Sequence, residues 1–118
     1  MELTVSHEPG YVLGCTSGTI DESAAEPLRE YLHPLVAQKG TRLILDLSDS
    51  QRITSAGIGQ LVKLVSDANS HASRVVLARV TPFVGEVLNV TRLNRFFDVT
   101  ETLSEAIELV CGQGSSRA

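Results

Sequence analysis

The sequence has few of the features that mark secreted, membrane-spanning or nucleic-acid-binding proteins. Its aromatic residues are three phenylalanines and two tyrosines, with no tryptophan, so leucine, valine, isoleucine and alanine must form most of the core. No apolar run approaches the ~20 residues that span a bilayer. The first ten residues carry an early acid instead of the apolar run of a signal peptide. We therefore expect a cytoplasmic protein without membrane insertion.

Cysteines and basic clusters are also scarce. Cys15 and Cys111 lie far apart and, without a secretory signal, are expected to be reduced thiols that fill packing space, with redox sensing as the alternative. The net charge is −4 and the ten basic residues are scattered, which argues against nucleic-acid binding. The length of 118 residues, 42% of them hydrophobic, suits one core. We predict a single domain over residues 1–111 and a disordered polar tail over 112–118.

The central feature of the chain is an apolar strand pattern followed by an amphipathic helix pattern. The strand is predicted from Arg42 to Leu47, and the helix is predicted to end near Ser70. Thr54 and Ser55 lie where this helix begins, followed by Ala56 and Gly57. A helix N-terminus offers unpaired N–H groups and the positive end of a dipole. It therefore suits either a capping hydroxyl or a phosphate group.

The residues before this strand predict a hairpin and a helix. Alternating polarity over residues 2–17, with a Pro-Gly turn, indicates two paired strands. In the next helix we favour Ser23 as the cap over Asp21, because Glu26 completes a capping box. Pro34 is expected to bend this helix near its end. Its apolar face is predicted to contain Leu28, Tyr31, Leu32, Leu35 and Val36.

The residues after the central helix predict further alternation of strands and helices. We expect a strand from Arg74 to Ala78, a short helix with Pro82 in its first position, and a packed connection containing Leu93, Phe96 and Phe97. A short strand near Val99 and a last helix capped by Thr102 follow. This order predicts an α/β fold, with a four- to five-stranded mixed sheet and about four helices packed mainly on one face.

Motifs for nucleotide, metal or covalent chemistry are absent. The sequence has no phosphate-binding loop, no dinucleotide fingerprint and no nucleophile elbow. His7, His33 and His71 lie on separate segments without metal-ligand spacing. We therefore predict no cofactor, no metal site and no enzyme activity. The alternative, an enzyme with Ser55 as its nucleophile, would require a histidine base beside Ser55.

An ordered set of motifs resembles the STAS domain family, which includes bacterial anti-sigma factor antagonists and the cytosolic tails of sulfate transporters. Asp46-Leu47-Ser48, followed by Thr54-Ser55-Ala56-Gly57-Ile58-Gly59, is similar to the antagonists' strand-D-L-S-loop-D-S-[ST]-G-L-G. Gly18-Thr19-Ile20-Asp21 resembles the family's G-x-[LI]-D, and residues 88–97 resemble its L-x-x-[TA]-G-L-x-x-x-F. Residues 74–80 resemble the strand before the family's third helix. The resemblance covers nearly the whole chain.

This resemblance implies protein binding controlled by phosphorylation in a partner-switching pathway. The implied partner is an anti-sigma factor that is also a serine kinase of the histidine-kinase-like ATPase type. Ser55 matches the phosphorylated serine of the family motif, with Thr54 as the fallback. Thr54 replaces the motif's aspartate and Ala56 replaces its second hydroxyl residue. The alternative is a STAS subunit, not phosphorylated, of a lipid-transport or stress-sensing complex.

The candidate partner-binding residues follow from the helix start and from the resemblance. They are Asp21, Thr54, Ser55, Gly57, Gln60 and Thr81. For Ser55 the structural alternative is a helix cap, and for Asp21 it is a cap on a surface loop. Asp46 is expected to hold the following loop by hydrogen bonds. Gly57 and Gly59 would normally weaken a helix, so we predict that a backbone approaches closely here, either from a neighbouring strand or from a partner.

Overall fold

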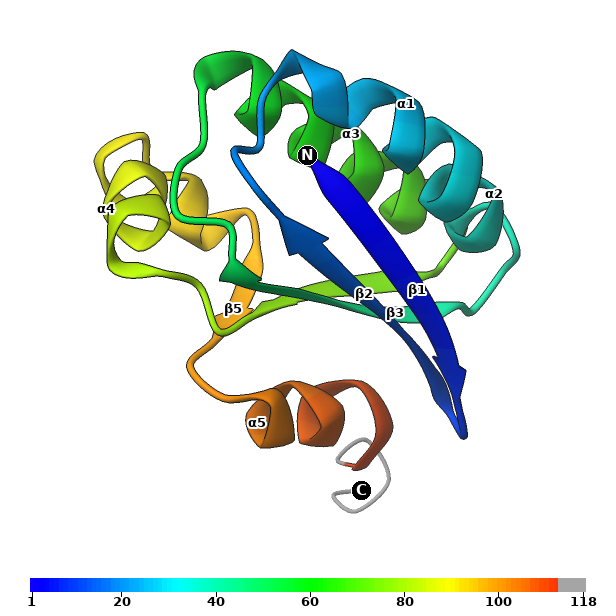
Figure 1. Ribbon diagram of the computed structural model, residues 1–118. Coiled ribbons are helices and arrows are strands. Elements are labelled where there is room, and N and C mark those ends of the chain that lie inside the picture. The colour runs from blue at the N-terminus through cyan, green and yellow to red at the C-terminus, as the bar shows by residue number, and fades with distance from the viewer. Residues whose placement is uncertain (113–118) are drawn as a thin grey trace.

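Five strands form one mixed sheet in the computed structural model, which describes residues 1–112 (Figure 1). The strands are β1 (Glu2–Glu8), β2 (Tyr11–Ser17), β3 (Arg42–Asp49), β4 (Arg74–Ala78) and β5 (Asp98–Thr100). Their order in the sheet is their order in the chain. β1 pairs antiparallel with β2, and every other neighbouring pair is parallel. The predicted hairpin and the central position of β3 are confirmed.

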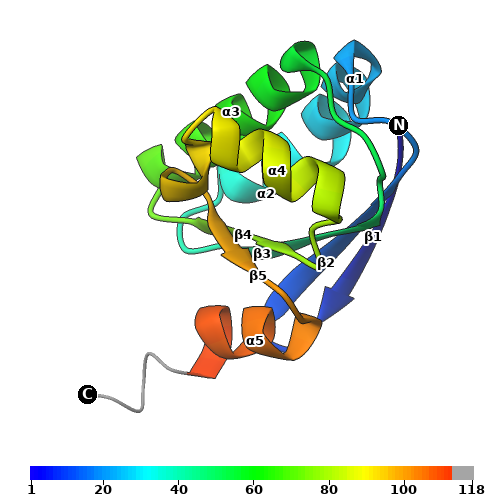
Figure 2. The same cartoon turned by 90° about the vertical axis from the view of Figure 1, so that its left-hand side faces the viewer.

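Helices cover both faces of the sheet unequally. The helices are α1 (Ala25–Pro27), α2 (His33–Val36), α3 (Ser55–Ser70), α4 (Pro82–Val90) and α5 (Leu103–Ile107). Figure 2 shows α1 to α4 on one face and α5 alone on the other. β3 is buried on both faces because Leu43 and Leu45 pack beneath the larger layer while Ile44 packs against α5. The predicted fold class is confirmed.

The segment between β2 and β3 differs from the prediction of one helix bent near its end by Pro34. A 3₁₀ turn, η1 (Glu22–Ala24), precedes α1, and a π segment, η2 (Leu28–Leu32), separates α1 from α2. The predicted Ser23 cap is wrong: Asp21 accepts a hydrogen bond from the Ser23 N–H and another from the Ser23 hydroxyl. An ionised carboxylate is the stronger acceptor at this position. The Ser23 hydroxyl instead accepts from the amino group of Met1.

The π segment also changes which side chains face the core. Leu28, Leu32 and Val36 are fully buried, four residues apart. Tyr31, predicted to lie on the same face, is 54% exposed, because the wider π turn does not follow α-helical spacing. The predicted burial of Phe96 is likewise wrong, since Phe97 takes the core position and Phe96 faces solvent.

The remaining predicted elements agree with the structure. α3 ends at Ser70, β4 runs from Arg74 to Ala78, and Pro82 begins α4. Thr102 and Glu105 form the predicted capping box at the start of α5. A second π segment, η4 (Glu108–Gly112), follows α5. The predicted tail lies outside the described residues, except for Gly112. Within residues 1–112, no helix is both long and apolar enough to cross a membrane.

Candidate functional site

The start of α3 presents two hydroxyl groups with different roles. The Thr54 backbone is extended, and its hydroxyl accepts a hydrogen bond from the Gly57 N–H at 3.2 Å. Thr54 is therefore the helix cap, and the alternative that Ser55 caps the helix is wrong. Ser55 is the first helical residue, is exposed, and has no side-chain hydrogen bond to any residue in the described part of the chain. Its hydroxyl is free to react or to bind.

The backbone around Ile20 fixes this helix start. The Ile20 N–H donates to Arg52 O, and the Thr54 N–H donates to Ile20 O. A Cβ atom on Gly57 would lie 1.9 Å from Ile20 O, so only glycine fits there. The predicted close approach is confirmed at Gly57. At Gly59 a Cβ would meet nothing within 4 Å, so no strand of the described residues approaches it, and an approach by a partner stays a prediction.

Buried hydroxyl groups support the loop that leads into α3. Thr16 and Ser50 share a 2.6 Å hydrogen bond, and the Thr81 hydroxyl donates to Ser50 O. These three residues lie on β2, on the loop and at the start of α4. Thr81 is only 9% exposed, so its side chain holds the loop from the buried side. Gly57 is also buried. Of the predicted contact residues, these two support the surface instead of lining it.

Asp21 lies beside the same surface because it follows Ile20 directly. Its hydrogen bonds from the Ser23 hydroxyl and the Ser23 N–H hold the pKa of the carboxyl group below its usual range. Asp21 therefore carries a full negative charge at neutral pH. Gln60, the remaining predicted contact, is partly exposed on the next turn of α3 beyond Ser55.

Asp46 holds the end of β3 through an ion pair that the sequence did not reveal. Its side chain is 5% exposed and accepts hydrogen bonds from Arg79 at 2.7 Å and from the Ser48 N–H at 3.0 Å. Burial raises the pKa of Asp46, but these hydrogen bonds outweigh burial and leave the pKa lowered. The predicted role of Asp46 in holding the loop is confirmed.

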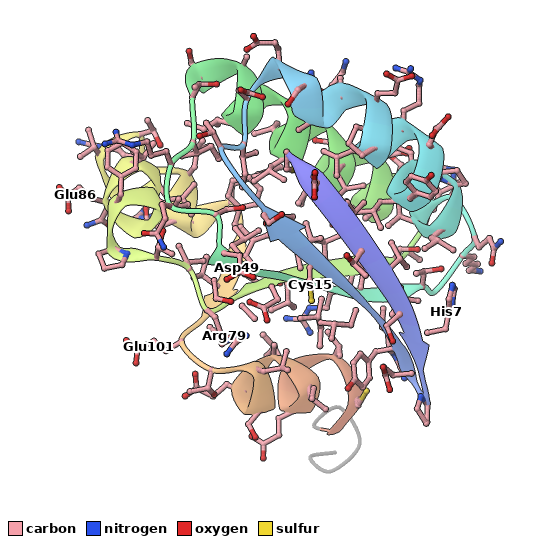
Figure 3. The ribbon with its side chains drawn as sticks, in the orientation of Figure 1. His7, Cys15, Asp49, Arg79, Glu86 and Glu101 are labelled. Atoms are coloured by element: carbon pink, nitrogen blue, oxygen red, sulfur yellow. The ribbon has the colours of Figure 1, made fainter. Side chains whose placement is uncertain are left out.

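The cysteine on β2 lies beside this ion pair. Figure 3 shows Cys15, Asp49 and Arg79 near the same end of β3. Burial and the Asp46 carboxylate raise the pKa of the Cys15 thiol, although Arg79 opposes them. The thiol therefore stays protonated at neutral pH and is a poor nucleophile, which disfavours redox sensing. Cys15 and Cys111 are both partly exposed, so neither is the buried packing residue that we predicted.

Two residues that the sequence analysis missed complete the exposed surface. The Arg52 guanidinium lies 5.4 Å from the centre of the Phe83 ring, and Phe83 is 45% exposed. This cation–π contact joins the loop before α3 to the first turn of α4. We call Asp21, Arg52, Thr54, Ser55 and Phe83 the α3-tip surface. The position of Phe83 beside Pro82, at the predicted start of a helix, was the only sequence signal for it.

No histidine in the described residues lies beside Ser55. His33 and His71 both contact Asp67, which is twelve residues from Ser55 on the same helix, or about 18 Å along its axis. His7 lies on β1, near the hairpin turn (Figure 3). Residues 1–112 also contain no group of three or more potential metal ligands.

Comparison with known proteins then decides the family. A family model described as the STAS domain matches residues 4–106. The chain belongs to the STAS domain family. BtrV of Bordetella bronchiseptica, provisionally named an anti-sigma factor antagonist, is 26% identical over 90% of this chain and 91% of its own. The predicted family is thus confirmed.

Solved structures of STAS proteins share the fold. A crystal structure from Thermotoga maritima, also provisionally named an anti-sigma factor antagonist, superposes with a TM-score of 0.80 at 21% identity, covering 92% of this chain and 93% of its own. The anti-sigma factor antagonist SpoIIAA, in its unphosphorylated form, superposes with a TM-score of 0.75 at 21% identity, covering 92% and 96%.

Proposed function

We propose that this STAS domain is an anti-sigma factor antagonist that binds an anti-sigma factor through the α3-tip surface. The observation that carries the proposal is Ser55, an exposed hydroxyl without a partner among the described residues, at the first position of α3. The names of BtrV and SpoIIAA support the same function. The protein acts by binding and not by catalysis.

The binding is switched by phosphorylation of Ser55 by the anti-sigma factor itself, a serine kinase of the histidine-kinase-like ATPase type. A phosphate group adds about −1.5 to −2 charge at pH 7. Within this chain the N-terminus of α3 tolerates that charge, because its N–H groups and dipole favour anions. Against a desolvated partner, the phosphate and the neighbouring Asp21 would be unfavourable without new basic groups. The partner is therefore released while the fold is kept.

Ser55 is a better acceptor than Thr54 for a geometric reason. The Thr54 hydroxyl already accepts the Gly57 N–H and closes the first turn of α3. A phosphate on Thr54 would remove that cap, whereas a phosphate on Ser55 leaves it in place. Thr54 remains the fallback acceptor in the test.

The test combines the purified protein with its cognate anti-sigma factor and ATP, and maps the modified residue by mass spectrometry. We expect phosphate on Ser55, no phosphate on Ser55→Ala, and retained binding of Ser55→Ala to the kinase. Phosphate on Thr54 would move the site by one residue. Tight binding to an active kinase without phosphate on either residue would contradict the switch. That result would favour a constitutive subunit of a lipid-transport or stress-sensing complex.

A further inference from the structure

A groove on the flank of α3 carries basic side chains that the proposed switch does not use. It has a volume of about 330 Å³ and lies between the segment that contains α1 and η2 and the middle of α3. Its lining residues are Ala25, Arg29, His33, Gln60 and Lys63. We call it the α3-flank groove. Arg29 and Lys63 are exposed and form no ion pair or hydrogen bond within residues 1–112.

The third basic side chain of the groove is held in a fixed orientation. His33 Nδ1 lies 2.9 Å from Asp67 Oδ2, and the imidazole is about three-quarters buried. Because a carboxylate can only accept, Nδ1 carries the hydrogen and Nε2 is left for a ligand. The same carboxylate lies 3.6 Å from His71 Nδ1, outside the groove lining. Asp67 therefore orients His33 while Arg29 and Lys63 keep their charges unpaired.

The charges of the groove define the chemistry of its occupant. Two unpaired cations, Arg29 and Lys63, line the same groove on a protein whose net charge is −4. Arginine suits a carboxylate through its planar fork, and lysine suits it as a point charge. Exposed glutamates on the same segment, Glu26 and Glu30, form no ion pair with either cation. An external anionic group would therefore find both cations available.

We propose that the α3-flank groove binds an acidic segment of the anti-sigma factor, so that one partner contacts both the α3-tip surface and the groove. This proposal rests on the proposed function. The groove and the α3-tip surface share α3: Gln60, which lines the groove and is a predicted partner contact, lies five residues after Ser55, or about 7.5 Å along the helix axis. The groove contact contains no residue of the switch, so it adds affinity for the partner without changing the switch, and phosphorylation of Ser55 still releases the partner.

The first experiment measures the Kd of the cognate anti-sigma factor by calorimetry for the charge-reversal variant Arg29→Glu/Lys63→Glu. The matched control is Lys39→Glu/Arg95→Glu, which makes the same charge change at exposed residues outside the groove. We expect the groove variant to weaken binding at least tenfold and the control less than twofold. Equal effects of the two variants would overturn the proposal. Thermal melts identify any variant that fails to fold, and Arg29→Gln/Lys63→Gln then replaces it.

A second experiment separates this proposal from the proposed function. A hexaglutamate peptide and inorganic phosphate are titrated separately into the isotopically labelled protein, and amide chemical shifts are followed by NMR. We expect saturable shifts at Arg29, Gln60 and Lys63 with the peptide, absent in the groove variant and retained in the control. Such shifts without any binding of an anti-sigma factor would refute the proposed function and support an acid-binding groove. Saturable shifts with phosphate but not with the peptide, or no saturable shifts, would overturn the proposal.

Discussion

At the scale of single residues, the carbonyl oxygen of Ile20 decides what position 57 can carry. Gly57→Ala would place a methyl carbon 1.9 Å from that oxygen, so either the backbone at Ile20 or the start of α3 must move. We expect the free energy of unfolding to fall by about 1–3 kcal/mol or more. Gly59→Ala is the matched control, because it has open space and should gain up to about 1 kcal/mol of helix propensity. Urea denaturation that gives equal changes for both variants would contradict this account.

Asp46 gives a second residue-scale prediction, this one dependent on pH. Arg79→Ala leaves the buried carboxylate with the Ser48 N–H and should cost about 1–3 kcal/mol at pH 7. The backbone at residue 79 has a positive φ of 55°, and alanine is as unfavourable there as arginine, so the substitution does not relieve backbone strain. Because the pKa of Asp46 is lowered in the folded protein, the ion pair stabilises above the unfolded pKa of about 3.9. That stability is lost as the pH falls through the folded pKa.

The measurement is therefore a comparison of urea midpoints for the native protein and Arg79→Ala between pH 7 and pH 3. The difference between the two urea midpoints should be largest at pH 7 and should become smaller towards pH 3. Arg95→Ala is a suitable control, since Arg95 is exposed and has no ion pair in residues 1–112. A difference that stays constant over the whole range would show that the Asp46 carboxylate is not responsible.

At the scale of elements, two neighbouring residues at the start of α3 have different roles: Thr54 caps the helix, and Ser55 is the proposed phosphate acceptor. Thr54→Ala removes the cap and should cost about 1 kcal/mol, whereas Ser55→Ala should change stability by less than about 0.5 kcal/mol. For phosphorylation we expect the opposite: Ser55→Ala should lose the phosphate label and Thr54→Ala should keep it, because only Ser55→Ala removes the proposed acceptor. Denaturation curves and kinase labelling of the same two variants test both halves. A large stability loss in Ser55→Ala would mean that its hydroxyl has a structural role.

Long elements with strong periodicity were predictable from the sequence, and irregular ones were not. α3 and β4 follow local patterns of burial, so their residues alone define them. The segment after β2 depends on distant groups, since the Met1 amino group bonds to Ser23 and leaves Asp21 as the cap. A sequence pattern within one turn contains no information about an amino group 22 residues away.

The same limit applies to the candidate site. The place of Ser55 at the helix start and the close approach of a backbone to Gly57 were predicted, because a helix start and a glycine both have local signals. The burial of Thr81 depends on the carbonyl of Ser50, 31 residues away. The contact of Arg52 with Phe83 joins the loop before α3 to the start of α4, and no periodic sequence pattern links these two segments. Only the folded sheet brings such pairs together.

At the scale of the whole molecule, α5 and η4 are the helical segments within residues 1–112 that cover the second face of the sheet. Val110 packs there beside Ile44 and Val76, so Val110→Ala should cost about 1–3 kcal/mol. Val90→Ala is the control, because Val90 is 70% exposed at the end of α4 and should change stability by less than about 0.5 kcal/mol. We expect one cooperative transition with an unchanged m-value. Separate transitions of far-UV and near-UV signals would mean that α5 unfolds before the sheet.

The strands lie in the sheet in the same order as in the chain, and this has a consequence for biosynthesis. As the chain leaves the ribosome, at about 5–20 residues per second, each new strand finds its neighbour already made. The segment Leu103–Val110 is made after all five strands and, among the described residues, forms the helical cover of the face that contains Ile44 and Val76. Until it emerges, a nearly complete sheet exposes one apolar side. The interval between the emergence of β5 and the docking of Leu103–Val110 is therefore when the nascent chain most needs a chaperone.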